Sequence, residues 1–372
     1  MNEAIEIYVH IPFCVRKCAY CDFYSHPADE AQMDAYIEEV LEEISLCPFS
    51  GREVSSVFFG GGTPSIADAG SIVKILEKLR QEFRVLTDAE ISIEVNPGTV
   101  TREKLRAFRN AGINRLSIGL QNASDAMLEK LGRIHRFRDF TETFRIAREE
   151  GFTNISADLI SGLPGETPEN FAESLKKVLS LEPEHLSVYS LIIEENTPFY
   201  ALYGPSGSHA DELPSEDTER ETAHLADRLL AGAGYRKYEI SNYAKPGYEC
   251  RHNLGYWTGV PYVGFGAAAA SYIDGKRFRN ALNDEYLALP YEECEVLDEK
   301  DRMSEMMILG LRLTEGVSRE AFRERFGKDL FTVYGDVIEK YVSLGALASD
   351  GGRVRLTPYG MDTANIVMAE FL

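Results

Sequence analysis

The chain has 372 residues, 44% of them hydrophobic and 27% charged, and its formal net charge at pH 7 is −21. This length and composition are typical of a globular protein with one large domain and a small one. The negative charge argues against nucleic acid as a partner, because phosphates favour clustered lysine and arginine. No run approaches the ~18 apolar residues of a membrane span. Since the N-terminus lacks a secretory signal and the six cysteines do not resemble a disulfide framework, we predict a cytoplasmic protein.

The first expected strand, Ile5–Ile11, leads into three closely spaced cysteines, Cys14, Cys18 and Cys21. Three thiolates at this spacing can hold three irons of a 4Fe–4S cluster, whereas full ligation takes four cysteines. No fourth cysteine lies nearby, so one iron would be open to a substrate or cofactor. A structural zinc site is the alternative, but such sites usually pair two Cys-x2-Cys units. The array therefore predicts an iron–sulfur cluster with an open iron.

Strand-like and helix-like segments alternate after the cysteines. In Asp29–Leu46 the apolar residues recur at the helical period and share one face. The further strands that we expect are Val54–Phe59, Ile91–Val95, Arg115–Gly119, Asn154–Ile160 and Leu186–Leu191. The expected helices are Asp29–Leu46, Ala69–Phe83, Thr101–Asn110, Ser124–Glu150 in two pieces, Thr167–Leu181 and Ser215–Ala231. This alternation implies parallel strands in an open barrel, in a closed barrel with two strands missed, or in a doubly wound sheet.

Several candidate site residues lie where the expected strands end, and barrel folds gather their functional groups there. The turn Gly60–Thr63 could bring its backbone close to a ligand, although a plain tight turn explains it equally well. Glu94 lies near the end of the third strand, Gln121 follows the fourth and Asp158 lies within the fifth. A buried carboxylate there needs a partner, either a ligand or a structural salt bridge. Arg133 could hold a carboxylate with its planar fork or lie on the surface.

The alternation weakens after Leu191. Gly204–Asp217 has the composition of a solvent-exposed loop, Tyr235–Tyr243 could form another strand, and Cys250–Ser271 is rich in aromatic residues and glycine. From about Val296 we expect three helices, a hairpin and a last helix, an arrangement that resembles a winged-helix module. These elements are Met303–Leu313, Ser318–Phe326, Asp329–Leu344, Leu347–Leu356 and Pro358–Phe371.

The C-terminal module, counted from Glu295 to Leu372, has 10 basic and 14 acidic residues and thus a net charge of −4. A winged helix that reads DNA should be basic, so we expect a docking or covering module. We divide the chain into a barrel at residues 1–235, a barrel extension at 236–294 and the C-terminal module at 295–372.

The candidate residues stand in six longer motifs. They are Tyr8-Val-His-Ile-Pro-Phe-Cys with the three-cysteine array, Phe59-Gly-Gly-Gly-Thr-Pro-Ser65, Glu94-Val-Asn-Pro, Leu116-Ser-Ile-Gly-Leu-Gln121, Arg133-Ile-His and Asp158-Leu-Ile-Ser-Gly-Leu-Pro-Gly165. Together they resemble the motifs of the radical S-adenosylmethionine superfamily and, within it, of the oxygen-independent coproporphyrinogen III oxidase-like group. The resemblance extends from Tyr8 to the C-terminal module.

The resemblance implies an α/β fold, a partial (β/α)6 TIM-like barrel with a small C-terminal winged-helix-like module. It implies a 4Fe–4S cluster on Cys14, Cys18 and Cys21, S-adenosylmethionine at the open iron, and a low-potential electron donor. The barrel wall would shield the chemistry of the cofactor from water. The residues implied to contact S-adenosylmethionine are Tyr8, Gly61, Gly62, Thr63, Glu94, Gln121, Arg133 and Asp158.

Two functions compete within this group. One is the decarboxylating oxidase that makes protoporphyrinogen IX, and the other is a haem chaperone that hands haem to acceptor proteins. Oxidases of the group typically carry a cysteine where this chain has Phe23, and a longer segment before the equivalent of Tyr8. Both departures favour the chaperone. A radical enzyme acting on an unrelated small substrate is a third hypothesis.

The segment His252-Asn-Leu-Gly-Tyr256-Trp257 resembles the His-Asn-x-x-Tyr-Trp motif of the chaperones. Imidazole can ligate haem iron and flat aromatic rings can stack on the macrocycle, so the resemblance implies a haem site at His252. A local hydrogen bond for His252 and a packing role for Trp257 are the alternative. We predict a haem chaperone without coproporphyrinogen oxidase activity. Its partners would be haem and acceptor haemoproteins, with membrane-bound respiratory enzymes as candidates, and it could be a monomer or a dimer.

Overall fold

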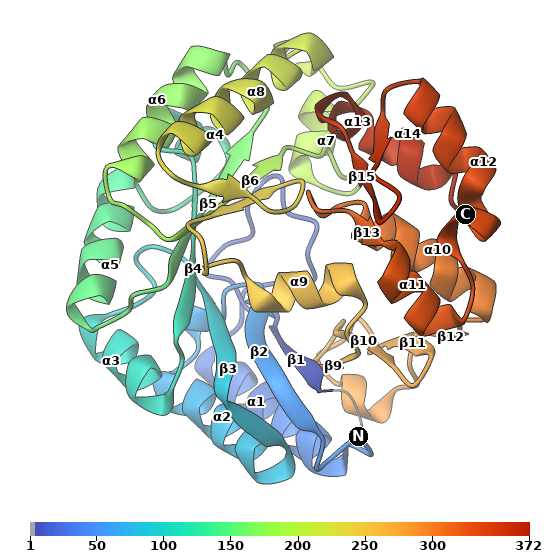
Figure 1. Ribbon diagram of the computed structural model, residues 1–372. Coiled ribbons are helices and arrows are strands. Elements are labelled where there is room, and N and C mark those ends of the chain that lie inside the picture. Colours follow the sequence, from blue (N-terminus) through green and yellow to red (C-terminus); the bar gives the residue numbers. More distant parts are fainter. Residues whose placement is uncertain (1–3) are drawn as a thin grey trace.

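Six parallel strands lie side by side in chain order in the computed structural model, which describes residues 4–372 (Figure 1). They are β1 (Ile5–Ile11), β2 (Glu53–Gly61), β3 (Arg84–Val95), β4 (Arg115–Gln121), β5 (Ile155–Ser161) and β6 (His185–Ser190). All five neighbouring pairs are parallel. The order has no reversal, which excludes a doubly wound sheet. The sheet of the described residues ends at β12 on one side and β7 on the other, so the barrel is open.

Helices cover the outer face of these strands (Figure 1). They are α1 (Glu30–Leu46), α2 (Ala69–Glu82), α3 (Arg102–Ala111), α4 (Asp125–Lys130), α5 (Phe137–Glu149), α6 (Pro168–Leu179) and α8 (Glu216–Gly232). The short helix α7 (Pro198–Tyr203) lies instead at the cysteine loop, where the N–H of Phe199 donates to Ala19 O at 2.9 Å. The ends of the expected helices lie within two residues of the observed ones, and the segment Ser124–Glu150 forms two helices as expected. Local capping explains the sharp starts: the side chain of Asp29 accepts the N–H of Gln32, and Thr167 does the same for Asn170.

The two faces of each strand differ in polarity. In β1, Ile5, Ile7 and Val9 are fully buried in the core beneath the helices. The alternate residues of the strands face the barrel lumen, and many are polar or charged although buried. Among them are Glu6, Ser56, Glu90, Ser92, Arg115, Ser156 and His185. Closed barrels usually fill this space with branched apolar side chains. The polar lumen is therefore the part of the fold that is suited to binding a ligand.

The chain then extends the sheet at both edges. The single strand expected at Tyr235–Tyr243 is wrong: the chain forms β7 (Arg236–Lys237) and β8 (Asn242–Ala244), which pair antiparallel. The carboxylate of Glu239 accepts the N–H of Ser241 at 2.8 Å and the amide of Asn242 at 2.6 Å, and this turns the chain back.

Helix α9 (Arg251–Thr258) comes next, and four strands follow it that the sequence analysis did not predict. They are β9 (Tyr262–Phe265), β10 (Ala270–Ile273), β11 (Lys276–Arg279) and β12 (Glu293–Val296). β9 pairs parallel with β1, so β1 lies inside the sheet. The glycine- and alanine-rich segment around these strands lacks the β-branched pattern that marks most strands.

The C-terminal module has its own core and a three-stranded antiparallel sheet, in the order β13-β15-β14. Its elements are α10 (Glu299–Gly310), β13 (Val317–Ser318), α11 (Arg319–Phe326), α12 (Leu330–Ser343), β14 (Leu347–Ser349), β15 (Arg353–Leu356), α13 (Pro358–Asp362) and α14 (Ala364–Ala369). This arrangement confirms the small helix-and-hairpin module. The last expected helix is not continuous, because Thr363 leaves the helical region at φ −121°.

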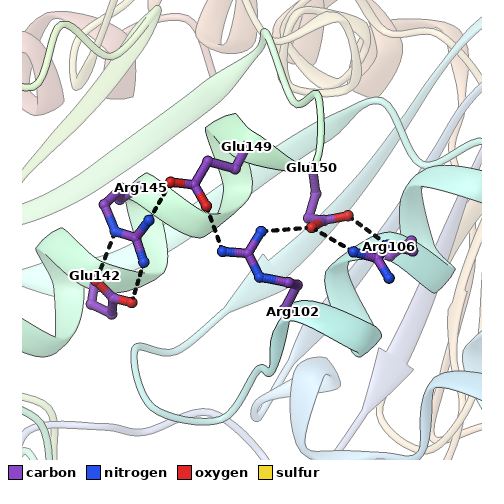
Figure 2. A network of polar contacts seen from close by, with 6 residues as sticks. All are labelled: Arg102, Arg106, Glu142, Arg145, Glu149 and Glu150. Carbon is purple, nitrogen blue, oxygen red and sulfur yellow. Dashed lines mark hydrogen bonds and ion pairs between the residues drawn. The ribbon is translucent and has the colours of Figure 1, made fainter.

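A network of ion pairs joins α3 to α5 on the outer side of the barrel (Figure 2). Arg106 Nε lies 2.9 Å from Glu150 Oε2, and Arg102 Nη1 lies 2.8 Å from Glu150 Oε1. Arg102 also contacts Glu149, which pairs with Arg145 one turn earlier. Elsewhere, none of the helices within residues 4–372 combines the length and apolarity that crossing a bilayer requires.

Candidate functional site

A cavity of about 560 Å³ runs from the rim of the barrel, where the cysteines lie, down into the lumen. The structure brings every residue of the expected site to this one cavity. Its lining includes Tyr8, Cys14, Cys18, Cys21, Gly61, Gly62, Thr63, Glu94, Gln121, Arg133, Asp158 and His252. Residues that are up to 244 positions apart (Tyr8 to His252) therefore share one space, as the carboxyl ends of neighbouring strands predict.

The cysteine loop follows β1 and is tied to its surroundings through its backbone. The N–H of Cys14 donates to His26 O at 3.0 Å, and the N–H of Ala19 donates to Leu131 O at 3.1 Å. The thiols of Cys14, Cys18 and Cys21 are free and half-buried at the cavity. Among the described residues no three His, Cys, Asp or Glu side chains converge on a single ion. A 4Fe–4S cluster takes each thiolate on its own iron, and three free thiols at one cavity are the donor set that three of its irons require.

A chain of polar contacts connects two of the cysteines. Thr63 Oγ1 lies 3.5 Å from Cys14 Sγ and accepts the amide of Asn96 at 2.7 Å. Arg133 Nη2 donates to Asn96 Oδ1 at 2.6 Å, and its Nη1 lies 3.5 Å from Cys18 Sγ. Asn96 was missing from the expected site, although it stands in the motif Glu94-Val-Asn-Pro.

Arg133 donates a further hydrogen bond from Nη2 to the carbonyl of Gly119 at 2.6 Å. Its guanidinium is thus occupied by protein groups around the cysteine loop, and the carboxylate contact expected from the sequence stays a prediction.

The glycine-rich turn packs against the cysteine loop. The N–H groups of Gly62 and Thr63 donate to Ile11 O at 2.9 Å and to Phe13 O at 2.8 Å. A Cβ at Gly62 would lie 2.7 Å from Phe13 O, closer than such contacts occur. Glycine is therefore required here by the approach of two protein segments, and these two N–H groups are not free for a ligand.

Two carboxylates lie at the middle of the cavity. Burial and the nearby Asp158 raise the pKa of Glu94 to about 8, and its Oε2 accepts the N–H of Gly61 at 3.2 Å. Asp158 accepts three hydroxyl hydrogen bonds, from Ser117 at 2.8 Å, Ser156 at 2.9 Å and Ser187 at 2.8 Å. Glu94 is therefore protonated at neutral pH, and a cationic ligand beside it would favour its ionised form.

Tyr8 and Gln121 approach the cavity from β1 and β4. The Tyr8 hydroxyl lies 3.0 Å from His10 Nδ1, and His10 Nε2 lies 2.9 Å from Tyr24 O, so Tyr8 is connected to the cysteine loop. Gln121 has a φ of +74°, a strained conformation for a residue with a side chain. The register of β4 and β5 shifts between Gly119 and Gln121, which turns the Gln121 backbone at the rim.

His252 lies at the start of α9, low in the lumen and 1% exposed. Its Nδ1 lies 2.8 Å from Ser56 Oγ, and its Nε2 lies 3.0 Å from the Tyr256 hydroxyl. Burial and the positive charge of Arg115 lower the pKa of His252 to about 3, so the ring is neutral. Both ring nitrogens are therefore engaged, and iron could bind only if one of these contacts opened.

A carboxylate in the lumen caps the N-terminus of helix α9. Glu90 accepts the N–H of Arg251 at 3.1 Å and the N–H of His252 at 3.2 Å. The negative charge complements the N-terminal end of the helix dipole. Sequence reasoning missed Glu90 and Arg115, because only the crossing of α9 beneath the barrel gives these strand residues a role.

Residues 8–178 match the family described as Radical SAM superfamily, and residues 297–362 match the HemN C-terminal domain. Among curated relatives, the protein named Heme chaperone HemW of Bacillus subtilis (strain 168) is 36% identical over 375 residues, covering 98% of each chain. The protein of the same name from Escherichia coli (strain K12) is 34% identical over 382 residues, covering 99% of this chain and 98% of the relative.

Among solved structures, coproporphyrinogen III oxidase (HemN) from Escherichia coli, described as a radical SAM enzyme, superposes with a TM-score of 0.86 at 26% identity. The superposition covers 100% of this chain and 90% of that chain. It confirms the partial barrel and the small C-terminal module that the motifs implied.

Proposed function

Because this chain belongs to the radical S-adenosylmethionine superfamily, in the family of the relatives named Heme chaperone HemW, we propose that it binds haem and transfers it to acceptor haemoproteins. The match to these relatives over nearly the whole length of both chains carries the proposal. The oxidase with the similar fold is 26% identical, below the 36% and 34% of the two relatives named above.

The superfamily implies a 4Fe–4S cluster and S-adenosylmethionine. We place the cluster on Cys14, Cys18 and Cys21, and S-adenosylmethionine on the eight residues implied by the resemblance. The three free thiols around one cavity and the polar chain through Thr63, Asn96 and Arg133 support this placement. When bound, the cluster and cofactor supply one-electron chemistry within the barrel.

The side chain at Phe23 favours the chaperone over the oxidase. It is 68% exposed at the mouth of the cavity, where the oxidases of the group typically carry a cysteine. A phenyl ring can neither bind a metal nor transfer a proton. It does give the rim an apolar surface, which suits contact with a hydrophobic molecule or partner.

The remaining assignments also stay proposals. We expect a cytoplasmic protein that receives electrons from a low-potential donor and that works as a monomer or dimer. The acceptors would be haemoproteins, with membrane-bound respiratory enzymes as candidates. The barrel extension at 236–294 would carry the haem motif, with His252 at or near the haem.

One anaerobic experiment separates the two functions. The protein with a reconstituted cluster is incubated with haemin, and separately with coproporphyrinogen III, S-adenosylmethionine and dithionite. We expect a stable haem spectrum that decays when an apo-haemoprotein is added, and no protoporphyrinogen. Formation of protoporphyrinogen, or failure to bind haemin, would contradict the chaperone function. A His252→Ala variant with the haem spectrum and affinity of the wild type would rule out His252 as the iron ligand.

A further inference from the structure

A second cavity, of about 290 Å³, lies on the far side of α9, at the joint between the barrel extension and the C-terminal module. We call it the joint cavity. Its aromatic wall contains Tyr256, Trp257, Tyr262 and Tyr272. The rings of Tyr256 and Tyr262 meet edge to face with centroids 4.7 Å apart, and those of Tyr262 and Tyr272 lie 6.4 Å apart. The rings are steeply inclined to one another, at 89° and 49°, so the wall offers ring faces and edges for packing against an apolar aromatic ligand.

Three arginines line the joint cavity, against a single carboxylate, Glu305. Arg277 Nη2 lies 2.6 Å from Glu305 Oε1. Within residues 4–372, Arg302 and Arg325 have no carboxylate within ion-pair distance, and Arg325 donates instead to the carbonyls of Thr258 and Gly259. A local excess of positive charge is unusual in a chain with a net charge of −21, and a planar guanidinium is well suited to a ligand's carboxylates.

The indole N–H of Trp257 adds an independent observation. Its Nε1 is buried, and in the described part of the chain it has no hydrogen-bond acceptor. One face of the indole is covered by Arg312, whose guanidinium carbon lies 4.3 Å from the ring centroid. A buried donor without an acceptor costs free energy, so a polar ligand atom that reached it would bind favourably.

From these contacts we propose that the joint cavity binds the carboxylate-bearing edge of a flat aromatic dianion, which under the proposed function is haem. The arginines Arg277 and Arg302 hold the propionates, and the aromatic wall packs against the macrocycle. The identity of the ligand rests on the proposed function, whereas the chemistry of the site rests on its own residues.

The size of the joint cavity agrees with a transfer role. Pockets that enclose drug-sized ligands measure about 300–1,000 Å³, and 290 Å³ is just below that range. A macrocycle as large as haem would be only partly enclosed, and its other edge would remain outside for an acceptor.

Tyr256 separates the two cavities, because it lines both. Haem in the joint cavity would lie outside the lumen that faces the cysteines, with Tyr256 between it and His252, whose Nε2 lies 3.0 Å from the Tyr256 hydroxyl. The C-terminal module supplies part of the site through α10 and α11, which carry Arg302 and Arg325. The C-terminal module, for which the sequence predicted a docking or covering role, would thus take part in ligand binding.

The test uses the full chain titrated with haemin and followed by its absorbance. We expect Arg302→Ala and Arg277→Gln each to weaken haemin binding about five- to tenfold, as lost charge-assisted contacts do. The matched control is Arg323→Ala, an exposed arginine on α11 outside the cavity, which should leave the affinity unchanged. Haemin with both carboxylates esterified should bind the wild type as weakly as haemin binds the double variant that combines Arg277→Gln and Arg302→Ala.

Far-UV circular dichroism shows whether each variant is folded, and the ester comparison tests the same contacts on the unmodified protein. Wild-type affinity in the folded double variant, or equal binding of haemin and its diester to the wild type, would overturn the joint-cavity site while leaving the chaperone function intact. Failure of the wild type to bind haemin would instead overturn the proposed function.

Discussion

Arginine and glutamate occupy two regions of this molecule under opposite conditions. On the outer face of α3 and α5 they form a network at the protein surface, in which hydrogen bonds from Arg106 and Arg102 lower the pKa of Glu150 (Figure 2). In the barrel lumen, burial raises the pKa of Glu6 and of Glu94 to about 8. Glu150 is thus ionised and paired outside, whereas Glu6 and Glu94 are protonated inside.

The lumen also holds a buried cation, the guanidinium of Arg115. Arg115 is 2% exposed, and within residues 4–372 its Nε has no hydrogen-bond partner. An arrangement this costly is seldom kept for stability alone. We infer that the lumen charges serve ligand binding, whereas the surface network only supports helix packing.

The largest effect should follow removal of the thiols that border the lumen. We expect the triple variant Cys14→Ala, Cys18→Ala, Cys21→Ala to lose iron–sulfur absorbance completely after reconstitution, because no other donor set at the rim can replace three thiolates. Cys294→Ala, at an exposed thiol away from the lumen, should keep the full absorbance. Iron–sulfur absorbance in the triple variant would place the cluster elsewhere.

A smaller effect should come from the lumen carboxylate beneath α9. Glu90→Ala leaves the N–H groups of Arg251 and His252 without an acceptor and removes a negative charge near Arg115. We expect a loss of about 3 kcal/mol in the free energy of unfolding, measured with urea. Glu90→Gln keeps an acceptor and should lose less. Equal stability of Glu90→Ala and the wild type would show that this lumen carboxylate contributes no more to stability than the surface network does.

The pH dependence of the free energy of unfolding should have opposite signs in the two regions, because the pKa of Glu6 is raised and that of Glu150 is lowered. Glu6 has a folded pKa of about 8 against 4.5 unfolded, so the folded chain binds more protons and its stability falls as pH rises from about 4.5 to 8. Glu6→Gln removes this cost. We expect its stability relative to the wild type to rise by about 1 kcal/mol per pH unit between pH 6 and 8. A constant difference across this range in urea titrations would mean that Glu6 is ionised in the folded chain.

The smallest effect is expected on the surface. Arg102→Ala breaks the bridge between Glu149 and Glu150, yet solvent and salt screen these exposed charges. We expect an unchanged midpoint of urea unfolding at 0.15 M salt and a slight decrease at 0.01 M. A large loss at both salt concentrations would show that the network contributes to stability as the lumen does.

The sequence predicted most of the barrel and the gathering of its site. The strands β1 to β6 were visible because each is a run of alternating or apolar β-forming residues between helical patterns. Glu94, Gln121 and Asp158 could be found because strand ends meet at one rim, whereas Tyr8 and Arg133 were added by the resemblance to the superfamily. Helix ends followed from local capping, as at Asp29.

Other features depend on contacts between distant segments and had no local signal. The lumen position of His252 arises only when α9 passes beneath the barrel and its N–H groups reach Glu90. The strands β9 to β12 consist partly of glycine, alanine and charged residues, and they become strands only because β1 presents an open edge to β9.

The placement of β1 between β2 and β9 has a consequence for synthesis of the chain. β1 can pair with β2 as soon as residue 61 has left the ribosome, but its other edge stays unpaired until β9 ends at residue 265. At the usual ~5–20 residues per second, those 204 further residues (265 minus 61) take roughly 10–40 s. During that interval the strand that carries the cysteine loop has one edge open. We expect this to be the period in which the nascent chain is most exposed to aggregation and most dependent on chaperones.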